Sequence, residues 1–239
     1  MPADAKLWSP DSPFLYQMEV SLISAGKLVD QIKSYVAMRK YSIKRDEHGI
    51  VRLQLNNKDL FQFGPLDQGW WPDGLYTAPT DEALRYDIEK TKDFGFNMIR
   101  KHIKVEPARW YMHCDREGIL VWQDLPSPNL PSGYEDYAKK NFEDESKRII
   151  TAFRNHPSII QWVVFNEGWG QFDTERMTQI VISEVGQSLV CCASGWVDAP
   201  IGDIKDSHSY PNPSCPLDET RAGVCGEYGG ITLKVQGHI

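Results

Sequence analysis

The 239-residue sequence has no long apolar run, and this absence argues against one class of protein. No stretch approaches the roughly 18 apolar residues of a membrane-spanning helix, so we expect neither a transmembrane helix nor a membrane partner. The first twenty residues also lack the basic-then-apolar order of a signal peptide. We expect that the N-terminus is incomplete, so this second absence leaves the compartment open.

Positive charge is scarce as well. The chain has 26 Lys and Arg residues against 33 Asp and Glu residues, a formal net charge of -7. An acidic protein of this kind is a poor general partner for nucleic acid. No GxGxxG motif follows the first expected strand of the barrel region, and no glycine-rich phosphate loop is visible near the last strands. We therefore expect no nucleic-acid partner and no cofactor.

Cysteine is sparse and has no metal-binding pattern. The five cysteines cannot all pair within the chain, and no CxxC or Cys/His cluster has zinc spacing. We interpret them as buried or idle thiols, and we expect no metal site. They are Cys114, Cys191, Cys192, Cys215 and Cys225. Eight tryptophans, by contrast, suggest a surface that stacks flat ligands such as sugars, although large cores also use this residue.

The N-terminal region reads as β structure. In FLYQMEVSL, apolar residues from Phe14 to Leu22 alternate with polar ones, which is typical of a half-buried strand. A second alternating run, 51–55, meets Asn56-Asn57 and then 60–63, which is a hairpin signal. Because these few strands cannot bury a core of their own, we interpret residues 1–40 as the end of an incomplete β domain together with a linker.

From about Leu60 the pattern changes to strands that alternate with helices. We expect helices that begin at Thr80, at Pro107 and at Asp173, and a further one that carries Phe142 and Phe153. Seven strands are expected, near 61–63, 97–100, 120–122, 159–165, 189–193, 206–209 and 222–225. Such alternation is typical of a covered parallel sheet. An open Rossmann-type sheet is the competing interpretation.

Seven strands in a row predict an α/β fold, a (β/α)8 TIM barrel that lacks its last unit. Only 12 residues follow Glu227 (239 − 227), too few for a further helix, strand and helix. We therefore assign residues 41–239 to a barrel domain truncated before strand 8. Two unpaired strand edges would remain, so we leave open whether these 239 residues fold or are active by themselves.

Polar and aromatic residues stand at the ends of the expected strands, where barrels of this kind place their active sites. Two carboxylates stand out, because Glu167 ends the fourth strand and Glu227 the seventh. Strands four and seven face each other across a barrel mouth, and glycoside hydrolysis needs such a pair of carboxyl groups. The other candidates from these strand ends are Asp67, Arg100, His102, Asp124, Asn166, Trp169, Trp196, His208 and Tyr210.

Several motifs together resemble glycoside hydrolase family 2, whose members include β-galactosidases, β-mannosidases and β-glucuronidases. They are LDQGWWPDGLYTAPTDEA (66–83), RKH (100–102), WQDLPS (122–127), NHPSIIQWVVFNE (155–167), ASGW (193–196), DSHSYP (206–211) and GEYGG (226–230). The resemblance covers about residues 60–231. It also implies that residues 1–40 are the remnant of an immunoglobulin-like β-sandwich domain.

The resemblance implies roles for the candidates. Glu167 would be the general acid/base and Glu227 the nucleophile, with Arg100 orienting Glu227. Asn166 would hydrogen-bond the sugar 2-hydroxyl. His208 or Tyr210 would lie near the nucleophile, with satisfied structural histidines as the alternative for His102 and His208. Further implied sugar contacts come from Asp67 and Asp124 and from the aromatic faces of Trp169 and Trp196, and each of these has a purely structural alternative.

The implied activity is hydrolysis of a terminal β-linked sugar with retention of configuration. Glu227 attacks the anomeric carbon while Glu167 donates a proton, and the carboxyl groups should lie about 5–5.5 Å apart. The substrate is expected to be a glycoside or oligosaccharide, most simply a β-galactoside, and the oligomeric state is left open. No Asn-Lys pair of the kind that marks glucuronate binding is visible. The alternatives are β-mannosidase or β-glucuronidase specificity, a non-catalytic or vestigial carbohydrate-binding module, and a barrel enzyme acting on phosphorylated metabolites.

Overall fold

A parallel β-sheet forms the centre of the molecule. The computed structural model describes residues 4–127, 135–234 and 236–237. Five strands pair in the order β10-β9-β8-β7-β6, each parallel to its neighbour. They are β6 (Leu66–Asp67), β7 (Met98–Lys101), β8 (Leu120–Asp124), β9 (Ile159–Asn166) and β10 (Leu189–Ser194). The spatial order follows the chain order, as successive strand–helix–strand units require.

Two further strands extend this arrangement. β11 (Ile204–Ser209) and β12 (Ala222–Tyr228) form a separate parallel pair beside β10. The Asp203 amide just before β11 donates to the carbonyl of Val190 in β10 at 2.8 Å. Among the described residues, seven strands between 66 and 228 pair in parallel with their sheet neighbours, which agrees with the predicted number and parallel pairing.

In the part of the chain that the structure describes, four helices lie between the strands, as predicted: α1 (Asp81–Asp93), α2 (Ala108–Glu117), α3 (Asp136–Phe153) and α4 (Thr174–Val185). Thr80 caps α1, since its hydroxyl accepts the Ala83 amide at 3.1 Å. Gly118 ends α2 in the left-handed conformation (φ 76°) that favours glycine. Asp173 precedes α4 but makes no side-chain cap there. Within the described residues, no helix is both long and apolar enough to cross a membrane.

The core has two layers, one on each face of the sheet. The layer beneath the helices includes Ile88, Trp110, Ile150 and Val181 from the helices and Trp162 and Val164 from β9. The inner layer includes Met98, Trp122 and Val163, together with Trp8 from the N-terminal segment. β9 is buried along its whole length because it is covered on both faces, which explains its continuous apolar sequence.

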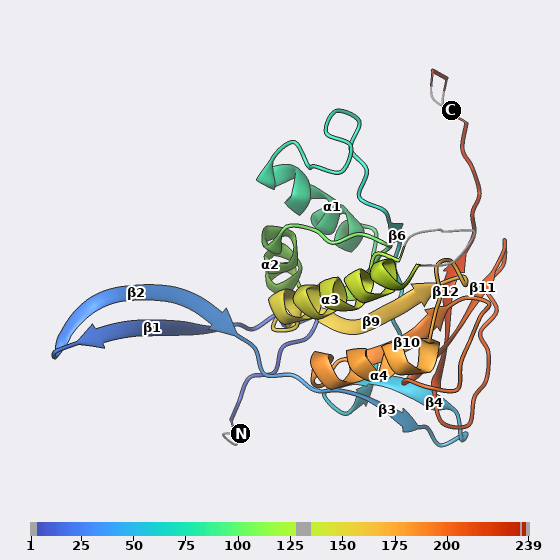
Figure 1. Ribbon diagram of the computed structural model, residues 1–239, viewed down its shortest axis with the longest axis horizontal. Helices are drawn as coiled ribbons and strands as arrows, with labels where there is room; N and C mark the ends of the chain where they lie inside the picture. Colours follow the sequence, from blue (N-terminus) through green and yellow to red (C-terminus); the bar gives the residue numbers. More distant parts are fainter. Residues whose placement is uncertain (1–3, 128–134, 235, 238–239) are drawn as a thin grey trace.

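The N-terminal strands form a ribbon and a small sheet. β1 (Tyr16–Ser24) pairs antiparallel with β2 (Lys27–Val36), and this ribbon projects from the body (Figure 1). β3 (Tyr41–Arg45), β4 (Val51–Leu55) and β5 (Lys58–Asp59) form an antiparallel sheet against the barrel region. Asn56 and Asn57 join β4 and β5 with positive φ angles of 54° and 63°, as in hairpin turns. The predicted turn at Asn56-Asn57 is thus confirmed, but the second strand of the hairpin is β5 and not residues 60–63.

The predicted strand near 61–63 was wrong, because the first parallel strand is β6, five residues further on. Phe61 and Phe63 stack on each other instead, with their ring centroids 6.3 Å apart. Asn97 satisfies the backbone of this segment through its side chain, accepting the Phe63 amide at 2.9 Å and donating to the Phe61 carbonyl at 2.8 Å. A side chain thus replaces the partner strand that an alternating pattern implies.

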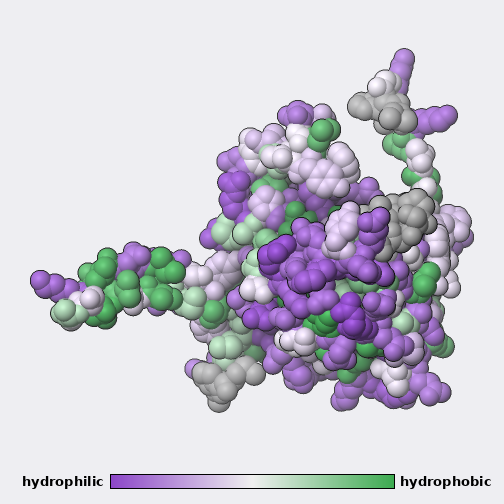
Figure 2. All heavy atoms as spheres, in the orientation of Figure 1, coloured by the Kyte–Doolittle hydropathy of each residue, from purple (hydrophilic) through white to green (hydrophobic). Residues whose placement is uncertain are grey.

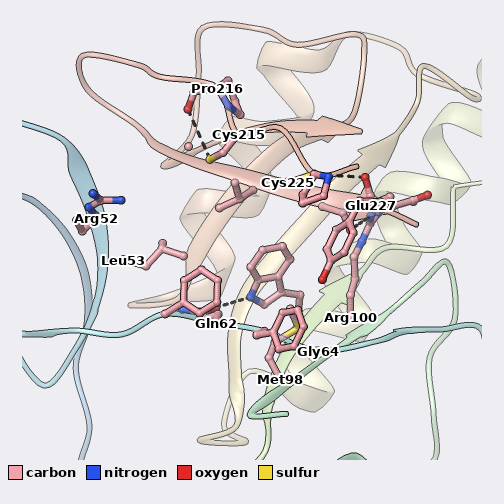
Figure 3. Close-up of a pocket in the computed structure, with 18 of the residues that line it drawn as sticks. Arg52, Leu53, Gln62, Gly64, Met98, Arg100, Cys215, Pro216, Cys225 and Glu227 are labelled. Atoms are coloured by element: carbon pink, nitrogen blue, oxygen red, sulfur yellow. Dashed lines mark hydrogen bonds and ion pairs between the residues drawn. The ribbon is translucent and has the colours of Figure 1, made fainter. Parts of the chain in front are cut away.

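The sheet does not close into a barrel within the described residues. β6 and β12 stand at its two open edges, and a cavity of about 1210 Å³ lies between them. Its walls are largely apolar, with Leu53, Met98 and Val224 among the lining residues. Figure 3 shows Arg100 and Glu227 at one end of this cavity and Arg52 with Leu53 at the other.

Candidate active site

The carboxyl ends of the seven parallel strands carry the polar residues that the sequence singles out. β7 supplies Arg100, β8 ends in Asp124 and β9 ends in Asn166, while β12 carries Glu227 near its end. In β11, His208 is the Cα partner of Glu227 across the parallel pair. Parallel strands bring these positions to the same edge of the sheet, so residues far apart in the chain meet there.

Arg100 contacts side chains from three other strands of the site. Its guanidinium is buried, with a side chain 2% exposed, and it makes a two-point contact with Asp124 (Nε–Oδ1 3.1 Å and Nη2–Oδ2 2.9 Å). It also donates to Asn166 Oδ1 at 2.8 Å and to Glu227 Oε1 at 3.0 Å. Burial by itself would lower the pKa of Arg100, but the surrounding carboxylates, Asp124 foremost, raise that pKa and keep the group charged.

Glu227 lies among hydrogen-bond donors. Arg100 contacts Oε1, and the Tyr210 hydroxyl donates a short hydrogen bond to Oε2. Burial and the contact with Glu227 raise the pKa of the Tyr210 phenol, so the phenol keeps its proton at neutral pH. The Nε2 atoms of His102 and His208 lie 3.6 and 3.7 Å from Oε1. Charge-assisted hydrogen bonds of this kind are short and hold the carboxylate in one orientation.

The backbone turns sharply at Glu167. This residue has a φ of 53°, in the left-handed region that few non-glycine residues occupy, and Gly168 follows with a φ of 79°. The Glu167 amide donates to the Ser194 carbonyl at 2.8 Å, which ties the turn to β10. Such a conformation costs on the order of 1–2 kcal/mol and needs a rigid support, which the fully buried β9 provides. The glycine after Glu167 lets the chain leave the strand at once.

A chain of hydrogen bonds runs from Glu167 into β11. Glu167 Oε1 lies 2.6 Å from His208 Nδ1, and His208 Nε2 lies 2.8 Å from the Ser194 hydroxyl. Ser194 in turn donates to Asp206 at 2.6 Å. We did not predict roles for Ser194 and Asp206 from the sequence, although each stands in a motif quoted above, ASGW and DSHSYP. Neither residue type signals a site until its neighbours in space are known.

Two buried polar atoms at the site have no hydrogen-bond partner among the described residues, namely Asn166 Nδ2 and His102 Nε2. Unpaired buried donors are rare, and at a strand end they are available to a ligand. Asn166 gives its carbonyl oxygen to Arg100, so its amide nitrogen is free to donate. Burial lowers the pKa of His102, so this ring is neutral at pH 7, and its Nδ1 contacts Gln68 at 3.1 Å.

Three predicted site residues lie at the border. Asp67 is engaged by the Gly69 amide at 2.7 Å and by buried Lys101 at 2.6 Å, in a group of residues distinct from the glutamate pair. Trp169 and Trp196 are 40% and 63% exposed, so their faces are open to a ligand. Trp196 also lies edge-on to the ring of His208, with centroids 6.1 Å apart.

The carboxyl groups of Glu167 and Glu227 lie close together, with His208 beside both. One ligating atom from each of Glu167, His208 and Glu227 lies within 4.8 Å of the others. Carboxylates and imidazoles are also metal ligands, but the Arg100 cation lies 3.0 Å from Glu227 and 3.5 Å from His208. A second cation there would be repelled, so we assign no metal to this group.

This geometry defines a class: proteins with a TIM-barrel type of parallel sheet and two facing carboxyl groups at the carboxyl ends of its strands. Comparison with known families is more specific. Residues 77–211 match the family described as Glycosyl hydrolases family 2, TIM barrel domain, and residues 3–39 match Glycosyl hydrolases family 2. The chain belongs to glycosyl hydrolases family 2, and the predicted resemblance is confirmed. The first match ends before Glu227.

The similar proteins carry more than one name. A putative beta-glucuronidase of Formosa agariphila is 31% identical over 168 residues, 68% of this chain and 16% of that protein. A beta-galactosidase of Lactococcus lactis is 28% identical over 174 residues, 69% of this chain and 17% of that protein. A solved beta-glycosidase from Bacteroides vulgatus superposes with a TM-score of 0.72 at 27% identity and covers 84% of this chain and 26% of its own. The chain thus spans a small part of the length of these relatives.

Proposed function

We propose that Glu167 and Glu227 hydrolyse a terminal β-linked sugar by double displacement, with retention of the anomeric configuration. The separation of the two carboxyl groups carries this proposal. Oxygens of Glu167 and Glu227 lie within 4.8 Å of each other. Retaining enzymes hold their carboxyl groups about 5–5.5 Å apart, whereas inverting enzymes leave about 6.5–9.5 Å for a water molecule.

The surroundings of Glu227 support its role as the nucleophile. Arg100 and Tyr210 donate to different oxygens of its carboxylate, which fixes the orientation of the group. Glu227 attacks the anomeric carbon, and the bond from that carbon to the leaving oxygen breaks. Glu167 gives its proton to the leaving oxygen, so the aglycone departs as a neutral alcohol.

The second half of the reaction reverses these roles. Glu167, now a carboxylate, removes a proton from water while the water oxygen attacks the anomeric carbon. The ester bond to Glu227 breaks, which restores the Glu227 carboxylate and the proton on Glu167. The free Nδ2 of Asn166 is placed to donate to the sugar 2-hydroxyl, an interaction that strengthens in the transition state.

The remaining predicted residues divide into two groups in this proposal. Asp124 uses both carboxylate oxygens on Arg100, so we assign it the positioning of that cation. His102 lies 3.6 Å from Glu227 and presents an unpaired Nε2, so we assign it to sugar binding. We keep Trp169 and Trp196 as stacking surfaces and Asp67 as a hydroxyl acceptor at the border of the sugar site.

We propose a neutral sugar, with a β-galactoside as the first substrate to test. A glucuronide carries a carboxylate that needs an uncommitted cation. Among the described residues at the strand ends, buried Arg100 and Lys101 are already paired with carboxylates. Lys104 is likewise paired with Glu106 at 3.0 Å. A β-mannoside and a β-glucuronide are the alternatives that the substrate panel distinguishes.

We also propose that the open sheet is part of an eight-stranded barrel of which these residues supply the first seven strands. The apolar cavity between β6 and β12 supports this proposal, because a strand inserted there would pair with both free edges. Residues 1–40 would then be the end of an immunoglobulin-like sandwich, and residues 41–239 the barrel without its last unit.

The test is a panel of aryl β-glycosides (galactoside, glucoside, mannoside and glucuronide) assayed with the wild-type protein and with Glu227→Gln and Glu167→Gln. We expect each substitution to reduce turnover by about 10³-fold or more, because each removes a covalent or proton-transfer role. Glu47→Gln, at an exposed position, serves as the matched control. Unchanged turnover in Glu227→Gln would reject the mechanism, and sugar binding without turnover would favour a carbohydrate-binding module.

A further inference from the structure

Asp206 has no part in the reaction described above, yet it is buried within hydrogen-bonding distance of the site. It is 4% exposed, and its two carboxylate oxygens accept different donors. The Gly226 amide donates to Oδ1 at 2.6 Å and the Ser194 hydroxyl to Oδ2 at 2.6 Å. A Cβ at position 226 would lie 2.2 Å from Oδ2, so only glycine allows β12 to approach this carboxylate.

The Ser194 hydroxyl has one proton, and this fixes the direction of the next hydrogen bond. Since Ser194 donates to Asp206, its oxygen can only accept from His208 Nε2, 2.8 Å away. The Glu227 carboxylate, 3.7 Å from the same nitrogen, also favours a proton there. Arg100 Nη1 lies 3.5 Å from Nε2, at the outer limit of contact, and already donates to Glu227 at 3.0 Å.

A proton on Nε2 leaves Nδ1 of a neutral His208 as an acceptor. Nδ1 lies 2.6 Å from Glu167 Oε1, and two acceptors cannot lie so close without a proton between them. If His208 is neutral, the proton in that contact is the carboxylic acid proton of Glu167, whereas an imidazolium would hold it on Nδ1 and pair with ionised Glu167. The opposite tautomer, with the proton on Nδ1, would donate to Glu167 and stabilise its carboxylate, which cannot act as an acid.

We propose that Ser194 and Asp206 are positioning residues that hold His208 in its Nε2–H tautomer, so that His208 accepts from Glu167 and stabilises Glu167 in its protonated form. The backbone at Gly195 packs tightly against the contact between His208 and Glu167. A Cβ at Gly195 would lie 3.0 Å from His208 Nδ1 and 3.2 Å from Glu167 Cγ. Burial raises the pKa of Asp206, while Arg100 and the Ser194 and Gly226 donors act against that rise.

The functional consequence rests on the proposed role of Glu167 as the acid. Loss of the Ser194 hydroxyl frees the imidazole to place its proton on Nδ1, which favours ionised Glu167. Glycosides with poor leaving groups need the acid proton, whereas a dinitrophenolate leaves without it. Ser194→Ala is therefore expected to slow poor leaving groups by about 10–100-fold more than good ones, whereas a general loss of structure would slow both equally.

The direct test is the imidazole ¹⁵N spectrum of the histidine-labelled 239-residue chain, with His208 assigned through His208→Gln. We expect a protonated Nε2 and an unprotonated Nδ1 in the wild type and in Ser194→Thr, which keeps the hydroxyl. We expect a shift toward the Nδ1–H form in Ser194→Ala. Ser207→Ala, whose hydroxyl donates to the Ser214 carbonyl at 2.6 Å, should leave the tautomer unchanged.

A wild-type His208 with its proton on Nδ1, or a tautomer unaffected by Ser194→Ala, would overturn the proposal. The spectrum does not depend on turnover, so it decides the tautomer even if no aryl glycoside is hydrolysed, in which case only the proposed function fails. If glycosides are hydrolysed and Ser194→Ala slows good and poor leaving groups equally, the proposed function stands and the tautomer has no role in acid catalysis.

Discussion

At the residue scale, one cation connects the groups to which we assign substrate contacts. Arg100 donates to Asp124, Asn166 and Glu227, so a single guanidinium sets the positions of an amide and two carboxylates from three other strands. Only arginine offers several donors in one plane, and lysine would place one point charge among the same partners. Because the Arg100 guanidinium is buried, each of its contacts is stronger than it would be in water.

We predict that Arg100→Lys keeps the charge but loses the geometry of the site. The expected result is about a 100-fold loss in kcat/KM, because Glu227 and Asn166 lose their shared support. Arg85→Lys, at an exposed pair with Glu89 on α1, is the control and should leave the rate unchanged. The measurement is steady-state kinetics with an aryl β-glycoside, and a wild-type rate in Arg100→Lys would show that the shared support is dispensable.

At the element scale, strand ends were the most predictable feature. An apolar run followed by Asn166 and Glu167 marks a buried strand and its exit, because a sequence this apolar needs cover on both faces. β2 (Lys27–Val36) and β6 were not predicted. β2 is almost entirely exposed and mixes polar and apolar residues, and β6 has only two residues, so neither gives a periodic signal.

The hydrogen-bond chain through Ser194 and Asp206 could not be predicted from the sequence, because it joins side chains from different strands. Ser194 ends β10 and Asp206 lies within β11, and their contact depends on how β10, β11 and β12 are placed against one another. A register shift between Ser207 and His208 brings His208 level with Glu227. Bulges of this kind re-aim side chains, and no spacing in the sequence announces one.

Glu143 of α3 links this helix to α4, because its carboxylate accepts hydrogen bonds from Lys147 of α3 and Arg176 of α4. This link leads to a pH-dependent prediction. Hydrogen bonds from Arg176 and Lys147 lower the pKa of Glu143 to about 2. Ionised Glu143 therefore stabilises the folded state fully above about pH 4.5, the ordinary pKa of a glutamate. This contribution is lost as the pH falls through about 2, the pKa of Glu143 in the folded state. Glu143→Gln should lower the free energy of unfolding by about 0.2–1 kcal/mol at pH 7 and by nothing near pH 2.

Urea unfolding of the wild type and of Glu143→Gln at both pH values checks this expectation. Glu145→Gln on the same helix is the control, since Glu145 has only a 3.9 Å contact with exposed Arg148. An equal loss of stability for Glu143→Gln at pH 2 and pH 7 would mean that the charge of Glu143 is not the cause.

At the scale of the whole molecule, the projecting ribbon is the most unusual feature. β1 and β2 expose Val20, Leu22, Ile23, Leu28, Val29 and Ile32, each at least 49% accessible. Figure 2 shows apolar residues gathered on this ribbon, away from the mainly polar body. Apolar side chains exposed over this extent favour contact with another apolar surface, in the same chain or in a second one.

We predict that the double substitution Val20→Lys with Ile32→Lys reduces self-association of the chain. These residues are cross-strand partners and belong to neither buried core cluster, so the melting temperature should stay unchanged. Ser21→Lys with Gln31→Lys, the neighbouring cross-strand pair, adds the same charge to polar positions. Light scattering measures the effect, and an equal reduction in both proteins would mean that charge alone is responsible.

The central claim is that two facing glutamates hydrolyse a β-glycoside through a covalent intermediate. The most direct test is the configuration of the sugar released first, followed by proton NMR before the anomers equilibrate. Double displacement by Glu227 and Glu167 predicts that the β-anomer forms first and that its formation is lost in Glu227→Gln. Initial release of the α-anomer would show that water attacks directly, and it would contradict the assignment of Glu227 as the nucleophile.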